Sequence, residues 1–212
     1  MQRLHIQKDS QIVITKSVGL SGAYHVLREH YDALHERYAA DFLAPVREYD
    51  TQFGYEREYE VLRQTPFDAV VESGYGGIFG ALFQLGSAAE LGISVDLRRI
   101  PIRQPVIEIA EFFDMNPYLL HSSGSMVIAC ANAERMVMAL RKAGVDAVCV
   151  GCMTKEKARI VYLDEEERFL VPARKDELLR CFDEAYVKKH FKKECNAYER
   201  ETFMKSLNNY SI

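Results

Sequence analysis

Apolar and polar residues follow two different periods along the chain, and these predict strands and helices in irregular alternation. Runs rich in β-branched residues predict strands near residues 11–16, 93–97, 126–131, 145–151 and 158–163. Apolar residues spaced three or four apart predict helices near residues 22–39, 56–64, 78–90, 104–114 and 134–143. The order predicts an α/β (α+β) domain built on a mixed β-sheet flanked by helices.

The C-terminal part of the chain is more polar. Leu178, Leu179, Phe182 and Tyr186 mark a last core helix, and the acidic run Asp164–Glu167 predicts an exposed hairpin tip. Residues 191–212 are basic and then mixed, which predicts a helical or frayed tail. We therefore expect one domain over residues 1–190 and a tail over residues 191–212.

Composition and charge narrow the class of protein. The 212 residues are 48% hydrophobic and 27% charged, enough for one sizeable core, and the net charge of −4 gives no global attraction to nucleic acid or to a membrane. The longest apolar run, Ile78–Leu85, is too short to span a membrane, and the first ten residues lack the apolar core of a signal peptide. These features predict a cytoplasmic protein.

The cysteines fit a reducing compartment. Their odd number and scatter predict no disulfide framework: Cys130, Cys149, Cys152, Cys181 and Cys195. Cys149 and Cys152 have the spacing of a redox or metal pair, but they lie in an apolar run and no second pair completes a zinc site. We expect both thiols to be reduced, mostly buried and on opposite faces of a strand, and we predict no metal site.

A glycine turn, Gly74-Tyr75-Gly76-Gly77, stands directly before an apolar helix. Unpaired N–H groups at a helix start attract anions, so this turn is a candidate phosphate site, although a tight turn into a buried helix explains it equally well. It matches neither the P-loop nor the dinucleotide fingerprint. Further candidate phosphate contacts are the hydroxyls of Ser73, Ser122, Ser123 and Ser125 and the guanidinium of Arg103.

Two smaller features have structural interpretations. Ser21, in a second glycine-containing turn, is expected to cap the helix that follows it. His25, His30 and His35 are spaced five apart, so they do not share one helix face, and we expect solvated rings.

Three stretches together resemble one family: GGIFGALFQLGSAAELGISVDLRRIPI, IEIAEFFDMNPYLLHSSGSMVIA and GVDAVCVGCM. They are similar to the C-terminal domain of the aminoimidazole ribonucleotide (AIR) synthetase-related superfamily, and most similar to its hydrogenase expression/formation (maturation) proteins of the HypE type. The resemblance covers roughly residues 10–180.

The resemblance implies an α/β domain whose glycine turn faces a nucleotide or phosphorylated substrate. Family members are ATP-dependent, and an additional N-terminal domain carries most of the magnesium ligands and the ATP surface. This chain resembles the second domain only, so autonomous catalysis is not expected. We expect it to bind ATP, another nucleotide with magnesium, or a phosphorylated ligand, and to form a homodimer or join a partner chain, as in hydrogenase maturation.

The chain also departs from the family pattern. Members often carry His-Asp-x-Thr-x-Gly-Gly where this chain has Val71-Glu72-Ser73-Gly74-Tyr75-Gly76-Gly77, and Glu72 is expected to repel a phosphate. The alternative is therefore a non-catalytic regulatory or assembly protein that kept the fold and lost the site. An aromatic stretch is a candidate cover for the surface left by the missing domain, or else packs on the chain's own core: Tyr49, Phe53, Tyr55 and Tyr59.

Overall fold

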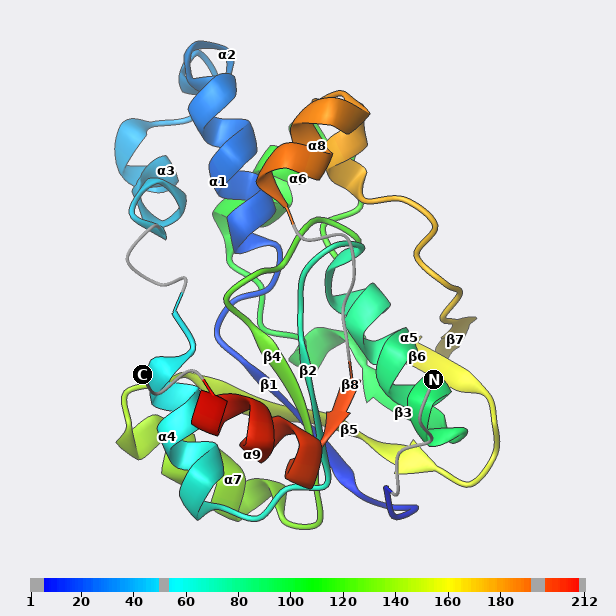
Figure 1. Cartoon of the computed structure of the whole chain (residues 1–212). Coiled ribbons are helices and arrows are strands. Elements are labelled where there is room, and N and C mark those ends of the chain that lie inside the picture. The colour runs from blue at the N-terminus through cyan, green and yellow to red at the C-terminus, as the bar shows by residue number, and fades with distance from the viewer. Residues whose placement is uncertain (1–5, 50–53, 192–196, 210–212) are drawn as a thin grey trace.

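The computed structural model describes residues 6–49, 54–191 and 197–209, and these form a mixed eight-stranded sheet with helices around it (Figure 1). The strand order is β7-β6-β3-β5-β1-β4-β2-β8, in which β3 and β6 are parallel and all other neighbours are antiparallel. The strands are β1 (Gln11–Thr15), β2 (Ala69–Glu72), β3 (Gly92–Asp96), β4 (Met126–Cys130), β5 (Ala147–Thr154), β6 (Arg159–Leu163), β7 (Glu166–Phe169) and β8 (Ala197–Glu199).

The helices form three groups around the sheet. The helices are α1 (Leu20–Glu29), α2 (Tyr31–His35), α3 (Ala40–Arg47), α4 (Glu56–Gln64), α5 (Gly77–Ala89), α6 (Gln104–Phe112), α7 (Ala133–Lys142), α8 (Glu184–His190) and α9 (Arg200–Asn209). Two short 3₁₀ turns are η2 (Leu97–Arg99) and η3 (Glu177–Arg180). Helix α5 covers one face of the sheet, α4, α7 and α9 cover the other, and α1, α2, α3, α6 and α8 gather at one end (Figure 1). The predicted α/β class with a mixed sheet is confirmed.

Side-chain alternation along the central strands builds two cores. In β1, Ile12 and Ile14 pack with α5, whereas Val13 packs with α4 and α7 on the opposite face. All three side chains are fully buried. A third core, among the helices at the end of the sheet, is centred on Leu27, Ile109 and other apolar side chains of α1, α3 and α6.

Five strands lie close to their predicted positions. The acidic run lies at a hairpin tip, as predicted, but only Asp164 and Glu165 form the turn, whereas Glu166 and Glu167 begin β7. The short strand β2 was not predicted as a strand. The helix predicted over residues 22–39 is two helices, which meet at His30, and the last predicted core helix is split into η3 and α8. These breaks turn the helical group back onto the end of the sheet.

The C-terminal tail adds an edge strand and a helix. Strand β8 pairs antiparallel with β2, through Ala69 and Val71, and α9 follows it directly. Phe203 of α9 is only 2% exposed and packs in the core beside Phe67. The described tail residues, 197–209, therefore contribute to the sheet and to its α4/α7 face.

The cysteine pair deviates from its prediction because β5 contains a bulge. The register of β5 against β1 shifts between Ile12 and Val13, so that Cys149 lies opposite Val13 and Cys152 opposite Gln11. Val13 and Gln11 are two apart, so both cysteines face the same side of the sheet rather than opposite sides. They are free thiols and half-buried, less buried than predicted. Cys195 lies outside the described residues.

Candidate functional site

Two turns that are far apart in sequence meet where β2 and β4 run side by side. The glycine turn Gly74–Gly77 leads from β2 into α5, and the Ser122–Ser125 turn leads into β4. The Ser73 N–H donates to the Ser125 carbonyl at 3.0 Å, and the Ser122 N–H donates to the Gly74 carbonyl at 3.2 Å. The structure thus brings together the two sets of candidate residues that the sequence placed in one site.

Close packing explains the two adjacent glycines. Gly76 and Gly77 both have positive φ, at 79° and 65°. A Cβ atom on Gly77 would lie 2.4 Å from the Tyr118 carbonyl oxygen, which is far inside van der Waals contact. The backbone of residues 118–120 therefore lies directly against the start of α5, and Gly77 is required there whether or not a ligand binds.

A carboxylate of the chain itself accepts the N–H of Gly76 in this turn. Asp176 is 2% exposed, and its Oδ2 accepts the Gly76 N–H at 2.7 Å. Its Oδ1 accepts the N–H groups of His121 at 3.3 Å and Leu178 at 2.9 Å. Burial raises the pKa of the Asp176 carboxyl to about 6, against the effect of the three N–H groups, which favour the ionised form. The sequence did not point to Asp176.

The serine hydroxyls are used largely within the protein. Ser122 Oγ accepts the Gly19 N–H at 2.7 Å, and Ser125 Oγ donates to the Ser122 carbonyl at 3.0 Å. Ser73 differs, because its hydroxyl is buried and finds no hydrogen-bond partner among the described residues. Ser21 does not cap α1 as predicted, since Gly19 is the N-cap residue.

Arg103 is engaged at the start of α6. Its guanidinium donates to the Pro45 carbonyl at 3.3 Å, and its N–H donates to Ser17 Oγ at 3.1 Å. These contacts tie α6 to α3 and to the end of β1. Arg103 does not line the cavity beside the glycine turn.

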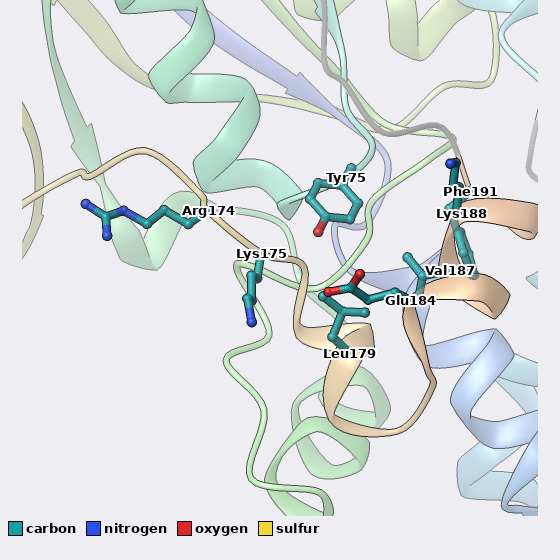
Figure 2. A pocket seen from close by; sticks show the side chains of 8 residues that line it. All are labelled: Tyr75, Arg174, Lys175, Leu179, Glu184, Val187, Lys188 and Phe191. Carbon is teal, nitrogen blue, oxygen red and sulfur yellow. The ribbon is translucent and has the colours of Figure 1, made fainter.

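A cavity of about 300 Å³ opens beside the glycine turn, between Tyr75 and the segment that carries η3 and α8 (Figure 2). It is lined by Tyr75, Arg174, Lys175, Leu179, Glu184, Val187, Lys188 and Phe191. Tyr75 and the Glu184 carboxylate lie at the centre of the view, whereas Arg174 extends to one side (Figure 2). Three basic side chains against one acidic one make the wall cationic, and their exposure leaves them accessible to a ligand.

These basic residues were not predicted from the sequence, because they stand in a polar segment with no regular period. The available signal was local. Lys175 directly precedes Asp176, which caps η3, and Lys188 follows shortly after Asp183, which caps α8. Aspartates able to cap two successive turns indicate ordered helix starts beside these lysines.

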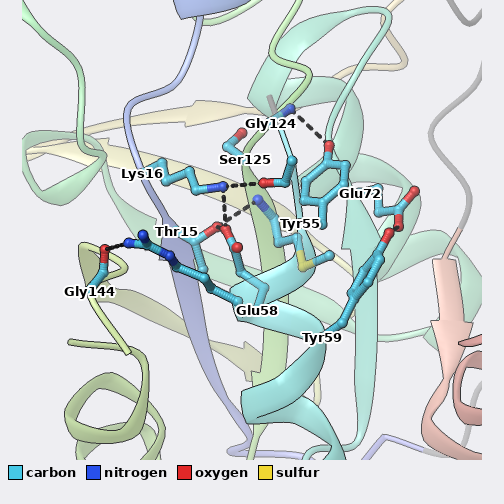
Figure 3. Close-up of polar contacts among 12 residues, drawn as sticks. Thr15, Lys16, Tyr55, Glu58, Tyr59, Glu72, Gly124, Ser125 and Gly144 are labelled. Atoms are coloured by element: carbon cyan, nitrogen blue, oxygen red, sulfur yellow. Dashed lines mark hydrogen bonds and ion pairs between the residues drawn. The ribbon is translucent and has the colours of Figure 1, made fainter. Parts of the chain in front are cut away.

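Glu72 faces away from the glycine turn. Its carboxylate accepts a hydrogen bond from the Tyr59 hydroxyl on the α4 side of the sheet, opposite α5 (Figure 3). Beside it, Glu58 is fully buried and forms an ion pair with Lys16 at 2.8 Å, and the Thr15 hydroxyl also donates to it at 3.3 Å. The expected repulsion between Glu72 and a bound anion is therefore weakened, because the sheet separates them.

The aromatic stretch packs on the chain's own core. Tyr49 is 2% exposed and donates to the Ser123 carbonyl, and the Tyr55 hydroxyl accepts the Gly124 N–H at 2.8 Å. Tyr59 stacks on Tyr55, and Phe53 lies outside the described residues. These tyrosines fix the Ser122–Ser125 turn and do not form an exposed cover.

Two histidines lie behind Phe191, one wall of the cavity. The rings of His25 and His121 contact Phe191 edge-on, with centroid separations of 4.6 and 4.5 Å. Burial lowers the pKa of His121 to about 3 and that of His25 to about 4. His25 and His30 are thus packed against aromatic rings rather than solvated as predicted, whereas His35 is exposed.

The described residues contain neither a candidate membrane span nor a candidate metal site. No helix within residues 6–49, 54–191 and 197–209 is long and apolar enough to cross a bilayer. Nor do His, Cys, Asp and Glu side chains gather there in groups of three or more that could hold a metal ion.

The structure is an α/β domain. A cavity with three basic side chains lies beside its glycine turn. Residues 7–164 match the family described as AIR synthase related protein, C-terminal domain. Since the match covers most of the chain, the protein belongs to this family.

The chain is also similar to known relatives. Over 93 residues it is 28% identical to carbamoyl dehydratase HypE of Azotobacter vinelandii, a match that covers 42% of this chain and 27% of that protein. The crystal structure of E. coli HypE, a hydrogenase maturation protein, superposes with a TM-score of 0.67 at 20% identity, covering 84% of this chain and 54% of that chain. The chain therefore spans about half the length of this structural relative.

Two further structures share the fold. HypE in complex with ATP has a TM-score of 0.61 at 15% identity and covers 82% of this chain and 53% of that chain. A HypE–HypF complex has a TM-score of 0.62 at 15% identity and covers 78% of this chain and 53% of that chain. At these identities the likeness shows a common fold.

Proposed function

We propose that this protein binds a phosphorylated small molecule, a nucleotide in the first instance, in the cavity between the glycine turn and α8. The observation that carries the proposal is the set of cationic side chains around Tyr75. Lys175 and Lys188 come from segments more than ten residues apart and converge on one cavity. A volume of about 300 Å³ lies at the lower end of the range for small-molecule sites.

The charges favour phosphate over a neutral ligand. Lysine ammonium groups are exposed point charges that bind phosphate oxygens, and Tyr75 offers a ring face for a base or sugar. Of the glycine turn, Tyr75 lines the cavity. The adjoining turn residues Ser73, Gly74, Gly76, Gly77, Ser122, Ser123 and Ser125 do not line it. Arg103 is not part of this proposed site. That a HypE structure contains ATP supports nucleotide as the first ligand to test.

Calorimetry on neighbouring lysines tests the proposal. Lys188 lines the cavity, whereas Lys189 is the adjacent exposed lysine of α8 and does not. We expect Lys188→Ala to weaken the binding of ATP or ADP by about fivefold, the effect of roughly 1 kcal/mol from one charged contact. Lys189→Ala should leave it unchanged. Equal affinities in the wild type and both variants, or no nucleotide binding with and without magnesium, would contradict the proposal and favour the assembly-protein alternative.

A second candidate function is that of a partner subunit in metalloenzyme maturation. Strand β7 is an open edge of the sheet; its last residue, Phe169, is 74% exposed, and Val171, two residues further on, is 68% exposed. Exposed apolar side chains on an edge strand, whose outer side has no neighbouring strand, are a ready docking edge for another chain. That a relative of this fold forms a complex with HypF supports the idea.

Sedimentation velocity tests whether this edge binds a second copy of the chain. If β7 mediates homodimerisation, Phe169→Ser lowers the sedimentation coefficient at concentrations where the wild type associates. Met138→Ser is the matched control, because Met138 is 66% exposed on α7, away from this edge. A wild type that stays monomeric at all concentrations rules out the homodimer.

A further inference from the structure

The start of α5 contains an anion position that the chain fills by itself. The N–H groups of Gly76 and His121 come from different turns, yet both point at the carboxylate of Asp176. N–H groups that converge at a helix start are the arrangement by which proteins bind phosphate. The buried Asp176 carboxylate is negatively charged, as a phosphate is, and the fold holds it in this position.

Ser73 supplies an independent indication of a ligand. The Ser73 N–H donates to the Ser125 carbonyl at 3.0 Å, which continues the pairing of β2 with β4 by one residue. Alternation along the chain then places the Ser73 side chain on the same side as Val71, the side that α5 covers. The hydroxyl is part of a residue that is 3% exposed, and within the described structure it has no hydrogen-bond partner. A buried hydroxyl without a partner is costly, so a donor left unused beside the start of α5 suits an acceptor that the protein itself does not supply.

We propose that Asp176 is an intramolecular substitute for a ligand phosphate, so that a phosphorylated ligand binds at the Gly76 and His121 N–H groups in competition with this carboxylate. The segment that carries Asp176 also carries Arg174 and Lys175. Displacement of the carboxylate would therefore move cationic side chains at the cavity edge in the same step. The proposal shares its ligand class with the proposed function but concerns a different set of contacts.

Removal of the carboxylate should open the position to a free anion. Asp176→Ala leaves the N–H groups of Gly76, His121 and Leu178 without their acceptor. We expect inorganic phosphate to raise the melting temperature of this variant in a saturable manner, because the ion binds only the folded state. Its affinity for phosphate should exceed that of the wild type by about tenfold or more.

Asp183→Ala is the matched control. Asp183 is likewise a carboxylate that caps a helix start, but it accepts the Tyr186 N–H of α8 and is exposed. This variant should bind phosphate as the wild type does. In the Asp176→Ala background, Ser73→Ala should weaken phosphate binding again, because the hydroxyl donor is lost.

If Asp176→Ala does not fold, Asp176→Asn provides the test, because it keeps the size of the side chain but removes the negative charge that competes with phosphate. Calorimetry should then show tighter phosphate binding than in the wild type. Equal phosphate affinity in the wild type and in the folded Asp176 variant overturns the inference. Nucleotide binding in the cavity would still be supported if Lys188→Ala weakens it. The two proposals can therefore be rejected independently.

Discussion

Gly77 is the residue at which the backbone leaves least room for a side chain. A Cβ atom there would collide with the backbone at Tyr118 and Leu120, and its φ of 65° is unfavourable for any other residue. We expect Gly77→Ala to lower the free energy of unfolding by about 2 kcal/mol or more, measured by urea denaturation. The cause would be packing and strain rather than lost ligand binding.

Gly80, in the same helix, is the control for this prediction. A Cβ atom on Gly80 would lie 3.2 Å from the Tyr75 carbonyl oxygen, a tight contact that the gain in helix propensity of about 1 kcal/mol offsets. Gly80→Ala should therefore change stability by less than about 1 kcal/mol. If both substitutions cost the same, the close approach at Gly77 is not what requires glycine there.

Buried titrating groups make stability depend on pH. The pKa values of His121 and His25 are lowered to about 3 and about 4 from an unfolded value of 6.5, with burial the largest cause of each shift. Below pH 6.5 the unfolded chain binds protons that the native protein does not, so acidification destabilises. Asp176 acts in the opposite sense below pH 6, because its pKa is raised from 3.8 to about 6 and its native carboxyl holds a proton that the unfolded chain has released.

On acidification, we expect the destabilisation that comes from the two histidines to exceed the stabilisation that comes from the Asp176 carboxyl. The free energy of unfolding should fall by about 2 to 3 kcal/mol from pH 7 to pH 4.5, the lower figure allowing for the partial solvent exposure of His25. His121→Asn removes one titrating ring and should flatten this dependence, whereas His35→Asn, on an exposed ring, should leave it unchanged. Urea denaturation at each pH gives the slopes. Parallel slopes in the wild type and His121→Asn would show that His121 is not the group that titrates.

At the level of single residues, sequence patterns located the turns but not their contacts. The glycines and serines were identifiable because turn chemistry is local. Asp176 and His121 were not, because their roles depend on contacts between segments far apart in sequence, such as the N–H of Gly76 with a carboxylate 100 residues away. Such a contact leaves no periodic pattern in the sequence around either residue.

At the level of elements, the tail is the part that sequence reasoning described least well. Strand β8 is only three residues long, and its pairing with β2 depends on a neighbour more than a hundred residues earlier. Strand β2 itself has four residues, too few to show a period. The longer strands β1 and β4 and the amphipathic α7 were predictable, because burial on one or both faces imposes a pattern on them.

Substitution of the buried Phe203 tests whether α9 packs on the sheet. We expect Phe203→Ala to lower the free energy of unfolding by about 3 kcal/mol, through lost burial and a cavity against Phe67 and Tyr59. Lys205→Ala, on an exposed position of the same helix, should have little effect. A neutral result for Phe203→Ala would mean that α9 does not pack on the sheet in solution.

At the level of the whole molecule, the fold brings the glycine turn, the Ser122–Ser125 turn and the segment from residue 170 to α8 to one end of the sheet. The family and the mixed sheet followed from sequence, since they rest on the order of long elements. The cationic cavity did not, because it is assembled from the glycine turn and from polar residues of a segment without a period.

The central claim is that a phosphorylated ligand binds between the glycine turn and α8, and mapping by amide NMR tests it most directly. A titration of the isotope-labelled protein with ADP and magnesium shows which N–H groups sense the ligand. The account predicts that the largest shifts cluster at Tyr75, Lys175 and Lys188, with Arg103 unaffected. Shifts centred elsewhere, or none at millimolar ADP, would contradict it.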